Sequence, residues 1–247
     1  MIEERFLTTD HTNVPESGVK RRKKNPPALS GSALSVQSAA QKRFWGESGQ
    51  VTTSIFPQVP PQAPQFPPSL AGWLCRALLR WSGWRVTGTL PDVPKLVLIG
   101  APHSSNWDGV WALAFKVALR VDIRFIIKND YTKGVLGPLV RGLGGIGIDR
   151  AAAHDVVTQM RLQFAAQDKL WLGITPEGTR KKVKKWKSGF WHIARAAGVP
   201  VQLLYFHYPD KTIGLGPLIE LTDDLDADMA RIREYYVPFQ GKNRGTV

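Results

Sequence analysis

The stretch of sequence that decides the fold is LVLIGAPHSSNWD, residues 96–108. It begins with four consecutive apolar residues, Leu96 to Ile99, which is the pattern of a short buried strand. A helix is predicted from Trp107 to about Leu119. A buried strand followed directly by a helix indicates an α/β fold.

Short apolar runs and helical stretches continue to alternate on the C-terminal side of this unit. Further strands are predicted at residues 122–128, 145–148, 170–174, 199–206 and 212–219, the last of which we place at an edge of the sheet. Helices are predicted at residues 152–167, 190–197 and 223–236, with a broken helix at 133–144. The chain has 247 residues, of which 43% are hydrophobic, so it can form one sizeable core. We assign residues 89–240 to a single α/β domain.

The two ends of the chain differ from this domain. Residues 1–68 are polar, with a basic run at 20–24 and several prolines from Pro57 onward, and we expect them to be a disordered tail that ends in a polyproline-like spacer. The basic run suits a contact with nucleic acid or anionic lipid, and equally a solvated charge cluster. Residues 241–247 are expected to be a flexible C-terminus.

Residues 69–88 form the link between the tail and the domain. Apolar residues, among them Trp73, Trp81 and Trp84, recur there at helical spacing, and arginines fall between them. An amphipathic helix of this composition is typical of an interfacial membrane anchor, with arginines at the level of the lipid headgroups. The alternative is an ordinary helix packed on the domain, and the sequence leaves both open.

Composition limits the partners and the compartment. The formal net charge of +13 favours polyanions, and nine tryptophans favour a lipid interface. The single cysteine, Cys75, excludes an intramolecular disulfide and suits a reducing compartment. Arginines interrupt every candidate transmembrane run, and the N-terminus lacks the pattern of a secretory signal. We expect a cytoplasmic protein, peripheral on the inner face of the cell membrane.

The first candidate for catalysis is the pair His103 and Asp108. The histidine lies just past a strand, where open α/β sheets place their ligand sites, and the aspartate lies on the first turn of the next helix. A carboxylate that accepts a hydrogen bond from Nδ1 leaves Nε2 to act as a general base. However, residues 105–108 also form an S-x-x-D capping pattern, in which Asp108 only satisfies the start of the helix.

Two further segments bring polar side chains to the ends of strands. Glu177, Gly178, Thr179 and Arg180 follow the strand at 170–174, where an arginine suits a phosphate, although the same residues are compatible with a plain surface turn. Arg150 follows the strand at 145–148 and suits either a phosphate or a surface acid.

Other catalytic motifs are not supported. Residues 142–147 match G-x-G-x-x-G, but a helix-like segment precedes them and a strand follows, which is the wrong order for a dinucleotide site. No serine lies in a G-x-S-x-G elbow, and the histidines lack the paired spacing of metal ligands, so we predict no metal site.

Together, these segments resemble the four motif blocks of the glycerolipid acyltransferases, typified by bacterial 1-acylglycerol-3-phosphate acyltransferase. The blocks are His-x4-Asp, a glycine-rich strand followed by Arg150, Pro-Glu-Gly-Thr-Arg at 176–180, and a helix followed by Gly198-Val199-Pro200, in this order. The resemblance runs from about Leu96 to Leu221 and implies a mixed, largely parallel β-sheet flanked by helices.

The resemblance also implies an activity: transfer of an acyl group from acyl-CoA or acyl-ACP to the hydroxyl of a lysophospholipid, without a bound cofactor and without a covalent acyl-enzyme. His103 and Asp108 would be catalytic. Arg150 and residues 177–180 would bind the acceptor, and Val199 and Pro200 would serve the acyl donor or the structure. This chain has Pro102 where many members have Asn, and Thr175 where many have Phe, which makes the acceptor less certain than the chemistry.

The lysine-rich segment 181–187 follows the third block directly. Anionic lipid, the phosphates of coenzyme A and an acidic carrier protein would each suit it, as would plain solvation. The alternative to an enzyme is a basic module that binds RNA or an anionic membrane without catalysis. Because no nucleic-acid recognition motif is present, we expect no specific nucleic-acid partner.

Overall fold

The computed structural model describes residues 56–135, 137–148 and 153–243. Their strands form one sheet in the order β1-β7-β6-β2-β5-β3-β4. The strands are β1 Arg85–Thr87, β2 Lys95–Ala101, β3 Ile123–Lys128, β4 Gly145–Ile148, β5 Leu170–Ile174, β6 Val201–His207 and β7 Thr212–Ile219. All neighbouring strands are parallel except β6 and β7, so the predicted mixed, largely parallel sheet is confirmed.

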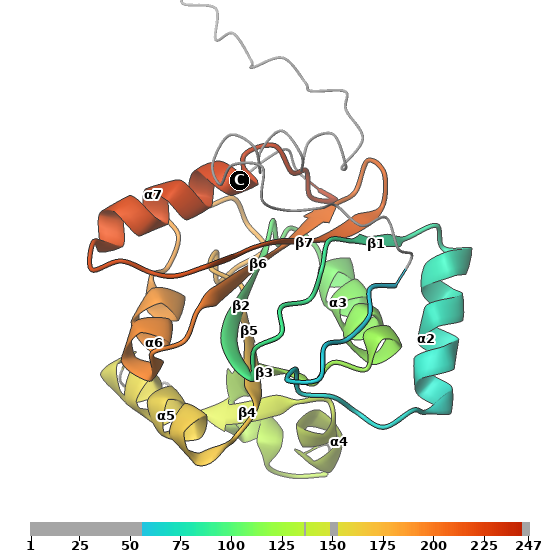
Figure 1. Cartoon of the computed structure of the whole chain (residues 1–247), viewed down its shortest axis with the longest axis horizontal. Helices are drawn as coiled ribbons and strands as arrows, with labels where there is room; N and C mark the ends of the chain where they lie inside the picture. Colours follow the sequence, from blue (N-terminus) through green and yellow to red (C-terminus); the bar gives the residue numbers. More distant parts are fainter. Residues whose placement is uncertain (1–55, 136, 149–152, 244–247) are drawn as a thin grey trace, which may run out of the picture.

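Helices cover both faces of this sheet (Figure 1). They are α2 Leu70–Trp81, α3 Asn106–Leu119, α4 Gly137–Gly142, α5 Ala153–Ala166, α6 Gly189–Ala197 and α7 Leu225–Tyr236, with the 3-10 helix η1 Asn129–Thr132. The central strand β2 separates two hydrophobic clusters, because alternate side chains of a strand point to opposite faces. Val97 and Ile99 pack with α5, α6 and α7, whereas Leu96 and Leu98 pack with α2 and α3.

The carboxyl ends of three neighbouring parallel strands, β5, β2 and β6, lie side by side. β2 lies between β5 and β6 and is parallel to both. Segments that follow these strands therefore meet, although they are far apart in the sequence: His103 follows β2, Glu177 follows β5 and Tyr208 follows β6.

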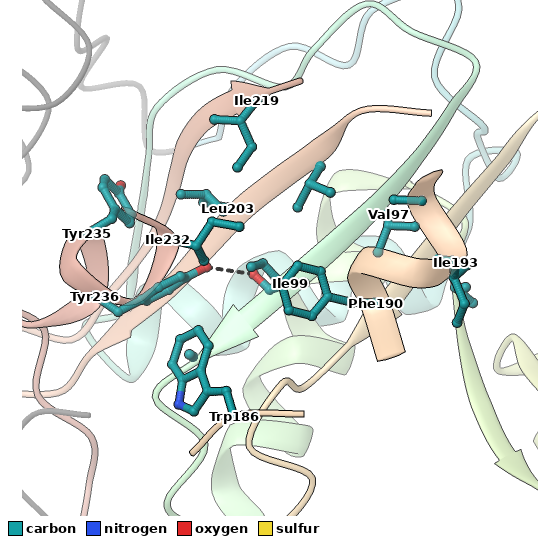
Figure 2. Packing of buried hydrophobic residues seen from close by; sticks show 14 of the residues in the cluster. Val97, Ile99, Trp186, Phe190, Ile193, Leu203, Ile219, Ile232, Tyr235 and Tyr236 are labelled. Atoms are coloured by element: carbon teal, nitrogen blue, oxygen red, sulfur yellow. Dashed lines mark hydrogen bonds between the residues drawn. The ribbon is translucent and has the colours of Figure 1, made fainter. Parts of the chain in front are cut away.

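A buried tyrosine fixes this end of the sheet. Figure 2 shows the Tyr236 side chain of α7 pointing toward Ile99 of β2. Its hydroxyl donates to the Ile99 carbonyl at 2.8 Å and accepts from the Leu204 amide at 3.1 Å. Because Tyr236 is fully buried, these bonds are protected from water. Helix α7 thus anchors β2 and β6 just before the residues that follow them.

The structure corrects the predicted helix at residues 69–88. Helix α2 ends at Trp81, and Arg85–Thr87 forms an edge strand beside β7. Gly83, with φ 77°, turns the chain at this point, since glycine adopts positive φ without strain. Because β1 covers β7, the prediction that residues 212–219 form an edge strand is wrong.

The N-terminal tail requires a second correction. We expected disorder through residue 68, but residues 56–68 pack on the domain. The Phe66 amide donates to Arg120 O at 2.8 Å, and the Asp122 amide donates to Pro64 O at 2.9 Å. Ala63 is fully buried. Residues 1–55, including the basic run, lie outside the described residues.

Helix α2 presents its apolar side to the outside. Its contact with α3 is made by the opposite side, where Leu79 is fully buried and Arg76 Nε donates to Ala118 O at 2.7 Å. Gly72 allows this close approach, because a Cβ there would lie 3.3 Å from Val117 O. The exposed side chains are Leu70 at 73%, Trp73 at 65%, Leu74 at 53%, Leu78 at 39% and Trp81 at 88%. We call these five residues the α2 stripe.

Candidate active site

His103 and Asp108 lie together at the end of β2. His103 Nδ1 is 3.2 Å from Asp108 Oδ2. The histidine side chain is 23% exposed, whereas the aspartate side chain is 1% exposed. A carboxylate on Nδ1 selects the tautomer in which Nε2 can accept a proton. The pair therefore has the geometry of a general base and the group that orients it.

Asp108 also caps helix α3, so the contact with His103 and the predicted helix cap occur together. The amides of Ser104 and Ser105 donate to Asp108 Oδ2 at 2.7 and 2.8 Å, and Ser105 Oγ accepts from the Trp107 amide at 3.1 Å. This is a capping box that shares its acidic residue with the histidine. The cap fixes the carboxylate against the loop that carries His103.

A residue that the sequence did not single out binds the other oxygen of the carboxylate. The Tyr208 hydroxyl donates to Asp108 Oδ1 at 2.5 Å. Burial raises the pKa of Asp108, but the hydrogen bonds from His103, Tyr208, Ser105 and Ser104 outweigh it and bring the pKa below its usual value. Asp108 is therefore ionised at neutral pH although it is buried. The position of Tyr208, just past a strand adjacent to β2, is the one signal that could have identified it.

Glu177, in the turn after the neighbouring strand β5, binds the loop that carries His103. Its Oε2 accepts a hydrogen bond from the backbone amide of His103 at 2.9 Å. The residue is 7% exposed, and burial raises its pKa to about 7, against the bond to the His103 amide, which lowers it. Glu177 thus holds the backbone of the histidine rather than the imidazole.

The remaining residues of the third block form a tight turn. The Gly178 amide donates to Thr175 O at 3.1 Å, and Gly178 has φ 64°, which suits glycine. Thr179 Oγ1 accepts from the Lys181 amide at 3.3 Å. Arg180 is exposed, so its guanidinium is accessible to an anion.

Arg150 lies outside the described residues, but the strand before it is described. β4 is separated from β2 by β5 and β3. Three strand spacings amount to about 14 Å between β4 and β2.

Val199 and Pro200 lie at the opposite end of the sheet from His103. The Pro200 carbonyl accepts from the Val97 amide at 3.0 Å, and the Val199 amide donates to Ala194 O at 3.1 Å. The six-residue step from Val97 to His103 spans roughly 20 Å of extended chain. This position supports the structural alternative for the fourth block, in which it starts β6 beside β2.

The C-terminal segment Gly241–Asn243 lies against the loop that carries His103, whereas we expected residues 241–247 to be flexible. Asn243 Nδ2 donates to Ser104 O at 3.0 Å. Gly241 is buried, and a Cβ there would lie 2.4 Å from Ser104 Oγ. Lys242 Nζ lies 4.8 Å from the centroid of the Trp107 ring. We call Gly241–Asn243 the C-terminal strap; residues 244–247 lie outside the described residues.

The basic segment after the third block is well exposed. Its exposed cations are Lys181, Lys182, Lys184, Lys185 and Lys187, which follow the exposed Arg180. Trp186 points inward and is 3% exposed, packed against Tyr236 at a centroid distance of 5.4 Å. The buried indole of Trp186 therefore anchors this segment to the domain, while its lysines stay exposed near the turn that carries Glu177.

Two kinds of feature are absent from the described part of the chain. Within it, no helix has the length and apolar character needed to cross a membrane. Nor do its His, Cys, Asp and Glu side chains form a group of three or more that could hold a metal ion.

Comparison with known proteins places this site in a family. Residues 85–206 match the family model described as Acyltransferase, and this span includes His103, Asp108 and Glu177. Among solved structures, the chain is similar to the 1-acyl-sn-glycerophosphate (LPA) acyltransferase, PlsC, from Thermotoga maritima, with a TM-score of 0.47 and 16% identity, covering 65% of this chain and 72% of that chain. No curated protein matches the chain. The chain belongs to the acyltransferase family, in agreement with the resemblance of its four motif blocks.

Proposed function

We propose that this protein transfers a fatty acyl group from an acyl thioester, acyl-CoA or acyl-ACP, to the hydroxyl of a lysophospholipid such as 1-acyl-glycerol-3-phosphate. The observation that carries the proposal is the His103 and Asp108 pair, in which a buried, ionised carboxylate faces Nδ1 of a histidine that is partly open to solvent. Such a histidine activates a hydroxyl without any bound cofactor.

The reaction follows from this geometry. Nε2 of His103 takes the proton of the acceptor hydroxyl as the oxygen attacks the thioester carbonyl. Asp108 stabilises the imidazolium that forms, because its Oδ2 lies 3.2 Å from Nδ1. The C–S bond then breaks, and the thiolate leaves with the proton from Nε2. The products are the acyl ester and the free thiol, and His103 is neutral again.

Acceptor binding is assigned to Arg180 and Arg150. The exposed guanidinium of Arg180 and the side chain of Arg150 suit the phosphate of the acceptor, since guanidinium groups bind phosphate through two parallel hydrogen bonds. Glu177 contributes indirectly, because its carboxylate holds the backbone amide of His103 in place. The lysines after Arg180 suit the anionic groups of the donor or of the membrane surface.

An assay on the purified protein tests the proposal. The protein is incubated with acyl-CoA or acyl-ACP and with lysophosphatidate, lysophosphatidylethanolamine or lysophosphatidylglycerol, and the diacyl product is measured. We expect transfer with at least one pair and none with His103→Ala. The matched control is His192→Ala, which removes an exposed histidine of α6 and should leave the rate unchanged.

The same assay separates the enzyme from a binding module. Absence of transfer with every donor and acceptor, or equal rates for wild type and His103→Ala, would remove the enzymatic proposal. Salt-sensitive binding to RNA but not to anionic vesicles would then favour a nucleic-acid module. A rise in KM for phosphate-bearing acceptors in Arg180→Ala, with kcat unchanged, is the expected result for a phosphate contact.

We further propose that the protein works on the inner face of the cell membrane, with the α2 stripe in the lipid interface. The five stripe residues are 39% to 88% exposed, and a contiguous apolar surface of this kind is unusual on a protein surrounded only by water. Helix α2 runs antiparallel to α3, because Gly72 lies beside Val117 and Trp84 beside Trp111. The Trp81 end of the stripe therefore lies toward the catalytic end of α3, where a lipid acceptor has to arrive.

Sedimentation with vesicles tests the membrane proposal. Trp73→Ser combined with Trp81→Ser should lower the bound fraction on vesicles of phosphatidylglycerol and phosphatidylcholine. Leu162→Ser is the control, because Leu162 is 55% exposed on α5, over the other face of the sheet. Transfer to a water-soluble short-chain acceptor should be the same in all three proteins, which verifies the fold. Unchanged sedimentation of the double variant would contradict the anchor.

A further inference from the structure

We infer that Tyr208 is a positioning residue for acyl transfer, which acts through Asp108 on His103. The inference rests on the proposed function, because it concerns the same site. Tyr208 is not part of the four motif blocks and reaches the site from the segment after β6. Its hydroxyl hydrogen bond to Asp108 Oδ1, at 2.5 Å, is the observation that carries the inference.

The two oxygens of Asp108 have different partners. Oδ2 accepts from the amides of Ser104 and Ser105 and faces His103 Nδ1. Oδ1 accepts from Tyr208. Because the Asp108 side chain is 1% exposed, bulk water does not reach Oδ1 to replace the tyrosine hydroxyl. Tyr208 therefore completes the solvation of a buried charge on the side away from the histidine.

Aromatic packing fixes the tyrosine in this position. The Tyr208 ring meets the edge of Trp84 at a centroid distance of 5.0 Å and an interplanar angle of 88°. Trp84 packs in turn on Trp111 of α3, at 5.1 Å. The Tyr208 amide donates to Gln240 O at 3.0 Å, immediately before the C-terminal strap. Ring and backbone are thus both held, so the hydroxyl is aimed at Asp108 before any substrate binds.

The consequence for catalysis concerns the charge and the orientation of the carboxylate. The bond from Tyr208 to Oδ1 lowers the pKa of Asp108 and fixes the carboxylate on the side away from His103. Without the hydroxyl, the pKa of Asp108 would rise, the ionised carboxylate would form only at higher pH, and its orientation toward Nδ1 would depend on the Ser104 and Ser105 amides alone. Tyr208 itself stays protonated, because burial and the bond to Asp108 raise its pKa. It therefore donates throughout the working pH range.

The other titratable groups near the pair are few among the described residues. Glu177 binds the His103 amide from the turn after β5, and Lys242 of the strap lies over Trp107. Because Glu177 has a pKa of about 7, it titrates in the range where the rate profile would be read. The effect of Tyr208→Phe on the pH profile of kcat/KM is therefore measured twice, once in the wild-type protein and once in the Glu177→Gln variant.

Tyr208→Phe tests the inference, because it removes only the hydroxyl. We expect kcat to fall roughly 10- to 100-fold, the effect of losing one charge-assisted hydrogen bond, with little change in KM. The acid limb of the kcat/KM profile should move to higher pH in both backgrounds. Tyr235→Phe is the matched control, since it removes a buried hydroxyl that has no hydrogen-bond partner. It should leave kcat and the profile unchanged.

A measurement without substrate keeps the inference independent of the activity. In the proton NMR spectrum, the resonance of the His103 Nδ1 proton should shift in Tyr208→Phe and not in Tyr235→Phe. An active wild type whose rate, profile and resonance are unaffected by Tyr208→Phe would overturn the inference. A wild type without acyl transfer would overturn the proposed function instead, while the resonance would still report on the contact between Tyr208 and Asp108.

Discussion

Glu177 and His103 are joined by a hydrogen bond of 2.9 Å, although they lie 74 positions apart in the chain. The bond runs from the backbone amide of the histidine to the carboxylate of the glutamate. Two motif blocks that look independent in the sequence thus form one piece of structure. A substitution of Glu177 in the third block should therefore alter the position of His103 in the first block.

The stability of the protein should depend on pH through Glu177. Burial raises its pKa from 4.5 to about 7, so the folded chain holds a proton that the unfolded chain releases. The stabilisation is complete below about pH 4.5 and is lost as the pH rises through about 7. In Glu177→Gln the side chain still accepts from His103 but cannot ionise. We expect the melting temperature of wild type, relative to this variant, to decrease between pH 4.5 and pH 8.

The control for this experiment is Glu220→Gln, at an exposed position on the segment before α7. Its melting temperature should follow wild type at every pH. The comparison has to be made between variants, because His207 adds an opposite slope: burial lowers its pKa, so that its contribution is lost as the pH falls. Parallel curves for wild type and Glu177→Gln would refute the titration of Glu177 in this range.

Asp108→Asn should affect both rate and stability, whereas His103→Ala should affect only the rate. The asparagine amide group would face one or more of the four donors around the carboxylate, which are the Ser104 and Ser105 amides, the Tyr208 hydroxyl and His103 Nδ1, and this costs roughly 1–3 kcal/mol of unfolding free energy. The rate should fall by about 10⁴, as expected when the partner of a catalytic histidine loses its charge. Acyl-transfer assays and chemical denaturation check the two effects. Equal stability of the two variants would contradict the capping role of Asp108.

Gly241→Ala should disturb the catalytic loop from the C-terminal strap. The new Cβ would lie 2.4 Å from Ser104 Oγ and 3.0 Å from Ser104 Cβ, so either the strap or the loop has to move. We expect a lower kcat and a lower melting temperature. Gly189→Ala is the control, because no atom lies within 4 Å of the Cβ position there. If both variants behave like wild type, the strap does not hold the loop.

Lys116→Met should destabilise the fold without changing the rate per folded molecule. Lys116 is a buried lysine of α3 whose Nζ donates to the carbonyls of Ile123 and Leu143 at 2.5 and 2.8 Å. Loss of these donors leaves buried acceptors unsatisfied, at a cost of roughly 1–3 kcal/mol. Lys169→Met removes an exposed lysine that donates to Pro61 O, and it should have no measurable effect in a denaturation experiment.

The order of strands and helices could be predicted because each element carries its own local signal. β5 and β7 begin and end at the predicted residues, and α7 lies within the predicted range with Asp224 as its cap. Strand β1 could not be predicted in this way. It has three residues, too few for any periodicity, and it exists because they pair with Thr212 to Gly214 of β7.

The orientation of α2 on the domain could not be predicted from the sequence either. The spacing of apolar residues predicts an amphipathic helix, but it does not say which side meets the domain. The side with Gly72 and Leu79 does so, because a helix approaches closely where a glycine removes the side chain. The polar, proline-rich composition of residues 56–68 wrongly predicts disorder. Pro64 and Phe66 are fixed by backbone hydrogen bonds to Asp122 and Arg120, and no property of the segment itself reveals these partners.

The candidate site was predictable where residues lie close in the chain and not where they meet across it. His103 and Asp108 share one loop and one helical turn, so their spacing indicates their contact. Tyr208 lies 100 positions from Asp108, and Asn243 lies 139 positions from Ser104. Only the arrangement of β2 beside β6, and the return of the chain after α7, bring these residues together.

The late position of Tyr208 and of the strap has a consequence for synthesis of the protein. A ribosome completes His103 and Asp108 well before it reaches Tyr208, and the strap that binds Ser104 comes later still. A growing chain therefore carries His103 and Asp108 for some time without the groups that fix them. The candidate site is complete only after Tyr208 and the strap have been synthesised and α7 has docked. Chains that stop before Tyr208 contain His103 and Asp108 but not the groups that fix them, and we expect such fragments not to catalyse the proposed acyl transfer.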